Sequence, residues 1–342
     1  MRAFITGVAG TALTDAERSF LREAQPWGLI VFARNIGAPD ELCRLIDDFR
    51  GTVGHDAPVL VDQEGGRVQR LGPPHWPKYP PAAVYGQLYE RDRARGIAAA
   101  ALGGRLIAAD LYGVGIDVDC APVADLPVAE ADLVIGDRAF GSEPNAVVAV
   151  AGAFARGLIE GGVLPVVKHM PGHGRAPADS HKKLPVVRTD RATLEVSDFA
   201  AFRGLADLPM AMAAHVVFAA IDPVAPATAS AAIVHDVIRR AIGFQGLLMS
   251  DDISMGALSG SLGERTRAVL AAGCDVVLHC NGDMAEMQSV AAAAPRLQGE
   301  AARRADAALA RRQPPLALDV AAKRAEFVAL LRGVWQPAQG WA

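Results

Sequence analysis

Short, almost continuously apolar runs recur along the whole chain, and each run ends in polar or glycine-containing residues. They do not alternate between apolar and polar positions, which is typical of parallel strands buried on both faces. The pattern therefore predicts eight buried strands. The runs cover residues 3–10, 28–35, 58–66, 115–126, 164–172, 208–218, 246–255 and 275–282.

Helix-like stretches separate these runs. The first begins with TDAE at Thr14, an N-cap residue followed by acidic residues in the first turn. Eight strands alternating with helices favour an α/β fold of the (β/α)8 TIM-barrel type over an open, doubly wound sheet. No G-x-G-x-x-G motif follows an early strand, which weakens the dinucleotide-binding alternative. The expected helices cover residues 14–25, 40–50, 84–111, 145–160, 193–206, 229–242, 264–272 and 284–294.

The end of the chain differs in composition from the part that carries the eight runs. Beyond about residue 297 it is rich in Ala and Arg, with an amphipathic stretch near residues 319–332. We expect one catalytic barrel, residues 1–297, with a helical extension, residues 298–342, packed on it. The Pro-rich stretch LGPPHWPKYPPA (71–82) is expected to form an ordered loop over one mouth of the barrel.

Composition narrows the classes of partner. The 342 residues are 51% hydrophobic and 21% charged, as in an ordinary globular protein, and the net charge of −4 is unlike that of a dedicated nucleic-acid binder. No apolar run of about 18 uncharged residues is present, so we expect no membrane span. The N-terminal MRAFITGVAG reads as a strand rather than an export signal, which favours a cytoplasmic enzyme. The sequence predicts no oligomeric state.

The four cysteines do not suggest redox or metal chemistry. None forms a C-x-x-C pair, and three lie in or beside apolar runs, so we expect buried, reduced thiols. The four are Cys43, Cys120, Cys274 and Cys280.

Polar residues concentrate at the ends of the predicted strands. In a TIM barrel the active site lies at the C-terminal ends of the strands. Because burying charge among apolar walls is costly, this repeated placement indicates a functional pocket. The residues concerned are Arg34, Asn35, Asp62, Glu64, Asp119, Asp125, Lys168, His169, His215, Asp251, Asp252, His279 and Asn281.

The stretch KHMPGHGRAPADSH (168–181) holds three of the eight histidines. His169 and His173 have the i, i+4 spacing of a helical zinc motif, but the Pro and Gly between them disfavour a helix and no Glu lies between them. A zinc-dependent barrel hydrolase using His169, His173 and His215 remains one alternative. A purely structural polar loop is another.

Acid–base chemistry is the third interpretation of this stretch. Asp179 and His181 are two residues apart, so in an extended chain they project to the same side, roughly 7 Å apart at Cα. A carboxylate there can orient the imidazole for proton transfer near neutral pH. SDDISM (250–255) adds two carboxylates suited to a nucleophile, a base or a metal ligand. Alternation sends Asp251 and Asp252 to opposite faces, and the pattern leaves open which one faces the pocket.

Three motifs in register carry a family resemblance: VDQEGGRVQRL (61–71), KHMPGHG followed by DSH (168–181), and SDDISM (250–255). Together they resemble glycoside hydrolase family 3, and more closely its single-domain bacterial β-N-acetylglucosaminidases of peptidoglycan recycling. The resemblance covers about residues 1–295. It implies a barrel that removes a terminal β-linked N-acetylglucosamine with retention of configuration.

The resemblance also implies roles for individual residues. Asp251 corresponds to the nucleophile, and His181, assisted by Asp179, corresponds to the acid and base. Asp252 is expected to support the site from behind. The resemblance assigns no role to His173, for which loop stabilisation is the simplest interpretation. Positions that match sugar-binding residues of the family are Asp62, Arg70, Arg138, Lys168 and His169.

The implied substrate is a small carbohydrate, N-acetylglucosaminyl-1,6-anhydro-N-acetylmuramic acid with or without its peptide, and no metal or organic cofactor is implied. Met170 stands where Phe is common in the family, which leaves the leaving-group preference open. A family relative of other specificity, either a β-glucosidase or a phosphate-using glycoside phosphorylase, therefore remains an alternative.

Overall fold

Eight parallel strands close into a barrel in the computed structural model, which describes residues 1–337. They follow one another in chain order, and the last pairs with the first, with Ile5 opposite Leu278. Each strand overlaps one of the eight apolar runs, so the predicted TIM-type barrel is confirmed. The strands are β1 (Arg2–Thr6), β2 (Pro26–Val31), β3 (Val59–Val61), β6 (Val118–Asp119), β7 (Leu164–Met170), β9 (Met210–Ala213), β11 (Leu247–Asp252) and β12 (Val276–His279).

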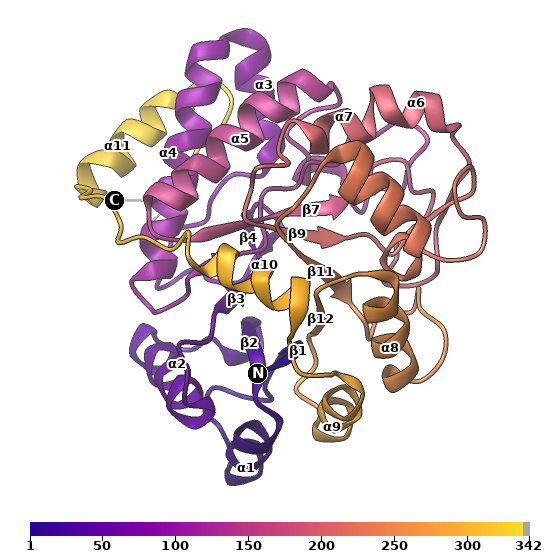
Figure 1. Cartoon of the computed structure of the whole chain (residues 1–342). Coiled ribbons are helices and arrows are strands. Elements are labelled where there is room, and N and C mark those ends of the chain that lie inside the picture. The colour runs from indigo at the N-terminus through magenta and orange to yellow at the C-terminus, as the bar shows by residue number, and fades with distance from the viewer. Residues whose placement is uncertain (338–342) are drawn as a thin grey trace.

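Helices surround the barrel (Figure 1). The predicted N-cap of the first is present, since the Thr14 hydroxyl accepts from the Glu17 N–H and the Glu17 carboxylate accepts from the Thr14 N–H. The helices are α1 (Asp15–Ala24), α2 (Pro39–Val53), α3 (Ala82–Arg91), α4 (Arg93–Tyr112), α5 (Pro144–Glu160), α6 (Arg191–Val196), α7 (Asp198–Arg203), the π-type η4 (Ile233–Ile242), α8 (Leu262–Ala272) and α9 (Met284–Ala293).

Two stretches predicted as single helices are each divided, so both predictions were wrong in this respect. The first ends at Asp92, whose carboxylate accepts the Arg95 N–H and caps a new helix. The second is interrupted at Ser197, whose hydroxyl donates to the Thr193 carbonyl while its backbone leaves the helical conformation. In both cases a short polar side chain bonds the local backbone.

The inside of the barrel is filled by apolar side chains, and one helix closes its N-terminal end. Ala305 and Ala308 of α10 (Gly299–Leu309) belong to the same apolar cluster as Ile5, Leu60 and Val166 of the strands. Figure 1 views the molecule from this side, with α10 in front of the strands. The opposite end of the barrel, at the C-terminal ends of the strands, is not covered by this helix.

The last described helix, α11 (Val320–Leu330), packs on α4. Its Phe327 is fully buried, with its ring 6.2 Å from that of Tyr85. Both C-terminal helices therefore contact elements of the barrel unit. The division into a barrel, residues 1–297, and an extension, residues 298–342, stays a prediction.

The Pro-rich stretch 71–82 is ordered, as predicted, but it lines no part of the pocket described below. Trp76 and Tyr79 are buried in the core, and the Tyr79 hydroxyl donates to Asp110 of α4 at 2.6 Å. The stretch packs behind the short hairpin of β4 (Gln63–Gly65) and β5 (Val68–Gln69), because burying its aromatic rings draws it onto α4. The expected position over a barrel mouth was wrong.

Two further predictions concern membrane spans and thiols. None of the helices within residues 1–337 is long and apolar enough to cross a membrane. All four cysteines are free. Cys120, Cys274 and Cys280 are buried as predicted, whereas Cys43 on α2 is only half-buried.

Candidate active site

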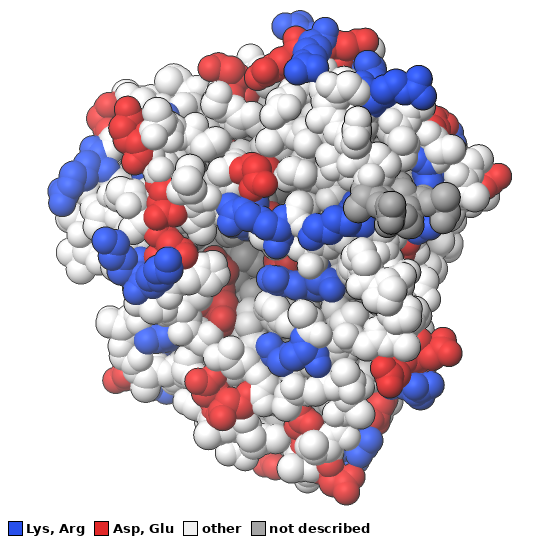
Figure 2. All heavy atoms as spheres, turned by 180° about the vertical axis from the view of Figure 1, so that it is seen from behind, with Lys and Arg blue, Asp and Glu red and all other residues white. Residues whose placement is uncertain are grey.

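A pocket of about 500 Å³ opens where the barrel strands end. It lies on the face opposite α10, which is hollowed near its centre and carries Lys and Arg side chains around the hollow (Figure 2). All eight residues predicted to act in catalysis or sugar binding line it: Asp62, Arg70, Arg138, Lys168, His169, Asp179, His181 and Asp251.

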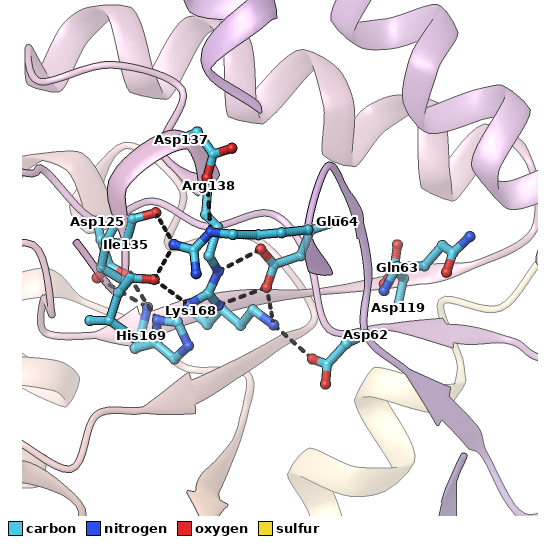
Figure 3. Close-up of polar contacts among 12 residues, drawn as sticks. Asp62, Gln63, Glu64, Asp119, Asp125, Ile135, Asp137, Arg138, Lys168 and His169 are labelled. Atoms are coloured by element: carbon cyan, nitrogen blue, oxygen red, sulfur yellow. Dashed lines mark hydrogen bonds and ion pairs between the residues drawn. The ribbon is translucent and has the colours of Figure 1, made fainter. Parts of the chain in front are cut away.

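Lys168, near the end of β7, is the central cation of the pocket wall. It is 2% exposed, and its Nζ lies 2.8 Å from Asp62 and 2.7 Å from Glu64 (Figure 3). Burial opposes its charge, but the two carboxylates outweigh burial and raise the pKa of Lys168 above its usual range. It therefore stays protonated and presents a fixed positive charge.

Two arginines complete this cluster. Arg138 donates from Nε and Nη2 to the two oxygens of Glu64, each at 2.8 Å, a bidentate pair with fixed geometry. Arg70 donates to Asp62 at 3.0 Å. Burial alone would raise the pKa of Asp62 and Glu64, but Lys168 first, and then the arginine paired with each carboxylate, hold both pKa values below their usual range. The cluster is thus a cradle of charged donors and acceptors suited to sugar hydroxyls.

His169, the neighbour of Lys168, is oriented by Asp125, which follows β6. The Asp125 carboxylate is fully buried and lies 2.7 Å from His169 Nδ1. It also accepts the backbone N–H groups of His169, at 3.3 Å, and of His173, at 2.6 Å. Burial opposes its ionisation, yet His169 keeps the pKa of Asp125 below its usual range. One ionised carboxylate thus fixes two histidines.

Asp179 and His181 form the dyad that their spacing predicted. Asp179 Oδ1 lies 2.8 Å from His181 Nδ1 and also accepts the His181 backbone N–H at 2.9 Å. The His181 side chain is 66% exposed at the pocket edge. Its Nε2 is therefore left to exchange a proton with a bound molecule. Partial burial opposes ionisation of Asp179, but its bonds to His181 lower its pKa.

Asp251 and Asp252 of β11 both reach the pocket but have different surroundings. The Asp252 carboxylate accepts from the Ser254 hydroxyl at 2.6 Å, the Ser254 N–H at 3.0 Å and the Cys280 N–H at 3.2 Å. Asp251 accepts the Asp252 N–H at 2.8 Å, and its other oxygen has no protein partner among residues 1–337. Asp251 is therefore the aspartate with an oxygen available to a bound molecule.

The surroundings of Asp251 keep it ionised. Burial would raise its pKa, but His215, His169, the Asp252 N–H and His181 together lower it. An ionised carboxylate and an exposed imidazole thus face the same pocket, an arrangement that suits nucleophilic catalysis with acid–base assistance.

Two acidic residues that hold pocket side chains in place, and several residues that line the pocket, were not assigned to the site from sequence. Glu64 and Asp125 were noted as polar residues at strand ends, but their pairing with Lys168 and His169 depends on contacts across the barrel. The requirement that a buried Lys have an acidic partner is the signal that could have identified Glu64. The residues that line the pocket itself but were not assigned to it include Phe32, Arg34, Arg67, His173, Ser180 and Asn281.

The three histidines of the zinc alternative have other partners. His169 pairs with Asp125, His173 Nε2 lies 3.0 Å from the Ser180 hydroxyl, and His215 lies 2.6 Å from the Thr228 hydroxyl and 3.0 Å from the Asp252 carbonyl. In the described part of the chain, no group of three or more His, Cys, Asp or Glu side chains is arranged to hold a metal ion.

Comparison with known proteins finds one family over most of the chain. The family model for the glycosyl hydrolase family 3 N-terminal domain matches residues 5–312. The chain is 41% identical over 279 residues to a beta-hexosaminidase of Alkalilimnicola ehrlichii, an alignment that covers 80% of this chain and 79% of that relative. Its structure is similar to that of NagZ from Neisseria gonorrhoeae in complex with N-trifluoroacetyl-D-glucosamine, with a TM-score of 0.84, 31% identity and 97% of each chain covered. The same NagZ in complex with zinc ion gives a TM-score of 0.83, with 31% identity over 96% of each chain.

Proposed function

This chain belongs to glycosyl hydrolase family 3, as its three motifs predicted, and from this premise we propose that it is a retaining exo-β-N-acetylglucosaminidase. One observation carries the proposal: the Asp179–His181 dyad and the ionised Asp251 line the same pocket as the charged cradle. In this proposal Asp251 is the nucleophile, and His181, oriented by Asp179, is the acid and base.

The cradle binds the terminal sugar. Asp62, Arg70, Arg138, Lys168 and His169 offer both acceptors and donors, which a ring with several hydroxyls and an acetamido group requires. The charged groups are paired before substrate arrives, so binding needs no new desolvation of a lone charge. The N-acylated glucosamine in the similar NagZ structure supports this type of ligand.

The first half of the reaction transfers the sugar to the enzyme. The Asp251 carboxylate attacks the anomeric carbon while the bond from that carbon to the leaving oxygen breaks. His181 Nε2 gives its proton to the leaving oxygen, and the Asp179 carboxylate stabilises the imidazolium that provides it. The product is a covalent glycosyl ester on Asp251 and a free alcohol.

The second half releases the sugar. His181, now neutral, takes a proton from a water molecule as that water attacks the anomeric carbon, and the ester bond to Asp251 breaks. Two inversions at the same carbon give net retention.

The natural substrate in this proposal is N-acetylglucosaminyl-1,6-anhydro-N-acetylmuramic acid, with or without its peptide, in cytoplasmic cell-wall recycling. The leaving group of such a substrate carries a lactyl carboxylate, which a cationic side chain at the pocket edge could bind. Arg34 lines the pocket, lies with its guanidinium over the Phe32 ring and bonds backbone carbonyls, and no carboxylate pairs with it within residues 1–337.

Release of nitrophenol from aryl β-N-acetylglucosaminide, beside the aryl β-glucoside, tests the activity. We expect turnover of the first only, unchanged by chelator. Preference for the glucoside would contradict the proposed specificity, and activity lost with chelator and restored by zinc would support the metal-dependent alternative. Added phosphate tests the phosphorylase alternative, because sugar 1-phosphate as the main product would replace the hydrolase proposal.

Asp251→Ala is expected to abolish turnover, because no covalent intermediate forms without its carboxylate. The fold should be spared, since that side chain accepts only one backbone hydrogen bond. Initial rates and thermal unfolding measure the two effects. Near-normal activity in this variant would refute the nucleophile assignment.

His181→Ala is expected to slow hydrolysis of substrates with poor leaving groups on the order of 10²–10⁴-fold, the usual contribution of general acid–base catalysis. Activated aryl leaving groups need little protonation, so formation of the glycosyl-enzyme from them should slow far less. Single-turnover release of dinitrophenol against hydrolysis of a disaccharide gives the comparison. Equal losses on both would argue against a general-acid role.

A further inference from the structure

Asp179 and His181, the two members of the dyad, flank Ser180, which is far more buried than His181. Ser180, between Asp179 and His181, is 2% exposed, although the His181 side chain is 66% exposed. Its hydroxyl lies 3.0 Å from Nε2 of His173, which is itself 3% exposed. The segment that carries the acid and base is therefore held from its buried side by one side-chain hydrogen bond.

His173 has no other side-chain hydrogen bond within the described residues. Its Nδ1 is buried without a partner, so Ser180 provides the ring's one polar contact. Burial, assisted by the neighbouring His169, lowers the pKa of His173 below the ordinary imidazole value. A buried imidazole with one nitrogen unsatisfied is costly, and loss of the bond to Ser180 would leave the ring with no polar partner at all.

The backbone of His173 is fixed to the sugar-binding wall. Its N–H donates to Asp125 at 2.6 Å, and the same carboxylate holds the His169 ring. The rings of His169 and His173 lie 5.8 Å apart, edge to face. A hydrogen-bonded chain therefore runs from His169 through Asp125 and His173 to Ser180, between the two members of the dyad.

The dyad has few other attachments to the barrel. Residues 171–185 contain no helix or strand. Before the dyad, Arg175 pairs with Asp198 at 2.6 Å and the Ala176 carbonyl accepts the Asp132 N–H at 2.9 Å. After it, the His181 carbonyl accepts the Gly256 N–H at 3.3 Å. The Asp179–His181 bond is internal to the segment, so it sets the ring orientation within the segment and not the segment's place over the pocket.

We propose that His173 and Ser180 are positioning residues for proton transfer, whose hydrogen bond holds the Asp179–His181 dyad at the pocket edge. This inference rests on the proposed function, because it concerns the leaving group that His181 protonates. Neither residue needs to touch the reacting atoms. Without their bond the dyad stays formed but occupies its working position for a smaller part of the time.

Ser180→Ala tests the proposal with two leaving groups. One net hydrogen bond corresponds to about fivefold in an equilibrium constant, so hydrolysis of N,N′-diacetylchitobiose should lose about fivefold in kcat. Single-turnover release of dinitrophenol, which needs little acid assistance, should change less than about twofold. KM for the disaccharide should stay close to that of the wild type, because the cradle is untouched.

Ser230→Ala is the matched control. Ser230 is as buried as Ser180, its hydroxyl bonds Asp222 at 2.6 Å, and it does not line the pocket. Any loss in this variant should be the same on both substrates. Ser180→Thr keeps the hydroxyl and should restore disaccharide turnover.

The partner variant His173→Asn and the double variant complete the set. If the two residues act through one bond, the double variant should lose no more than the worse single variant. Equal losses on both substrates, additive losses, or a loss under twofold in folded Ser180→Ala would overturn the proposal. If Ser180→Ala fails to fold, His173→Asn alone decides by the same ratio of the two rates. A wild-type enzyme inactive on both substrates would instead refute the proposed function.

Discussion

Lys168 is the residue on which the charge balance of the pocket depends. It is buried between Asp62 and Glu64, and each of those carboxylates has one further cation, Arg70 or Arg138. Removing one partner from a buried ion pair costs about 3–5 kcal/mol, because the charges left behind cannot be resolvated. The loss of one cation should therefore affect stability as well as binding.

Lys168→Met is expected to lower the free energy of unfolding by about 3–5 kcal/mol at pH 7, as measured by urea denaturation. Lys323→Met is a suitable control, since the Lys323 side chain on α11 is 42% exposed and pairs with Glu326; its change should stay within about 0.5 kcal/mol. A Lys168→Met variant as stable as the wild type would contradict the account of the cluster.

The pH dependence of this difference has a definite sign. Folding lowers the pKa of Asp62 and Glu64, so their contribution is fully present above their ordinary values of 3.8 and 4.5 and is lost as pH falls towards the lowered values. Folding raises the pKa of Lys168, so its contribution is present below 10.5 and is lost as pH rises beyond that. The stability gap between wild type and Lys168→Met should be flat from about pH 5 to 9 and shrink below about pH 4.

At this scale the sequence predicted which side chains meet at the pocket but not all their partners. Asp179 and His181 could be paired because two residues of extended chain fix their separation. Asp125 and His169 lie 44 positions apart, and only the closed barrel brings them together. The burial of Ser180 between two pocket-facing residues also depends on how the loop packs, which no local pattern encodes.

Among the elements, the segment from β6 to α5 places Arg138 over the pocket, and the part next to Arg138 is bonded by one arginine. Arg67, after the β4 strand, bonds Asp137 at 3.0 Å and the carbonyls of residues 133–135. Arg138 follows directly in a short 3₁₀ turn, Gly136–Arg138. Arg67 therefore fixes the position from which Arg138 reaches Glu64.

Arg67→Ala is expected to raise KM about tenfold, equivalent to about 1.4 kcal/mol, while kcat changes less, because a cradle residue loses its fixed position. Steady-state kinetics measures this. Arg105→Ala is a matched control: Arg105 likewise bonds one carboxylate and the carbonyls of residues 316 and 317, but it lies outside the pocket. The two variants giving the same KM would contradict a specific role for Arg67.

The strands were easier to predict than the helix boundaries. Near-continuous apolar runs mark strands buried on both faces, and all eight were recognised. The breaks at Asp92 and Ser197 depend on single hydrogen bonds to the local backbone, which the apolar periodicity of the surrounding helices does not show.

Across the whole molecule, the two C-terminal helices join the barrel by different routes. α10 closes the inside of the barrel, whereas α11 covers α4 through Phe327. If residues 298–342 belong to the same folding unit as the barrel, a destabilising substitution at Phe327 should lower the stability of the barrel as well. This gives a test of the predicted division of the chain.

Phe327→Ala is expected to lower the free energy of unfolding by about 3–5 kcal/mol, the usual cost of emptying a buried aromatic site. A single transition, seen alike by circular dichroism and by loss of activity, should shift to lower denaturant. Leu316→Ala, at a position 55% exposed, should have little effect. A barrel that keeps its activity through an earlier, separate transition would show that the extension unfolds on its own.

The order of strands, their closure and the end of the barrel that holds the pocket all followed from the alternation of elements, because parallel strands with helical connections place their C-terminal ends on one face. The position of the Pro-rich stretch did not follow. Its Trp76 and Tyr79 are buried in the core, where removing their rings from water stabilises the fold. A local sequence pattern does not show which of two surfaces such rings will pack against.

The paired aspartates of β11 illustrate how little redundancy adjacent residues can have. Because Asp252 is adjacent to Asp251, it could be expected to take over the role of Asp251 if that residue were lost. Asp252, however, has both carboxylate oxygens committed to Ser254 and Cys280, so it could attack a sugar only by giving up the turn that shapes the end of the strand. A chain that lost Asp251 would thus have no substitute beside it, and restoring activity by mutation would require the aspartate to return at that one position.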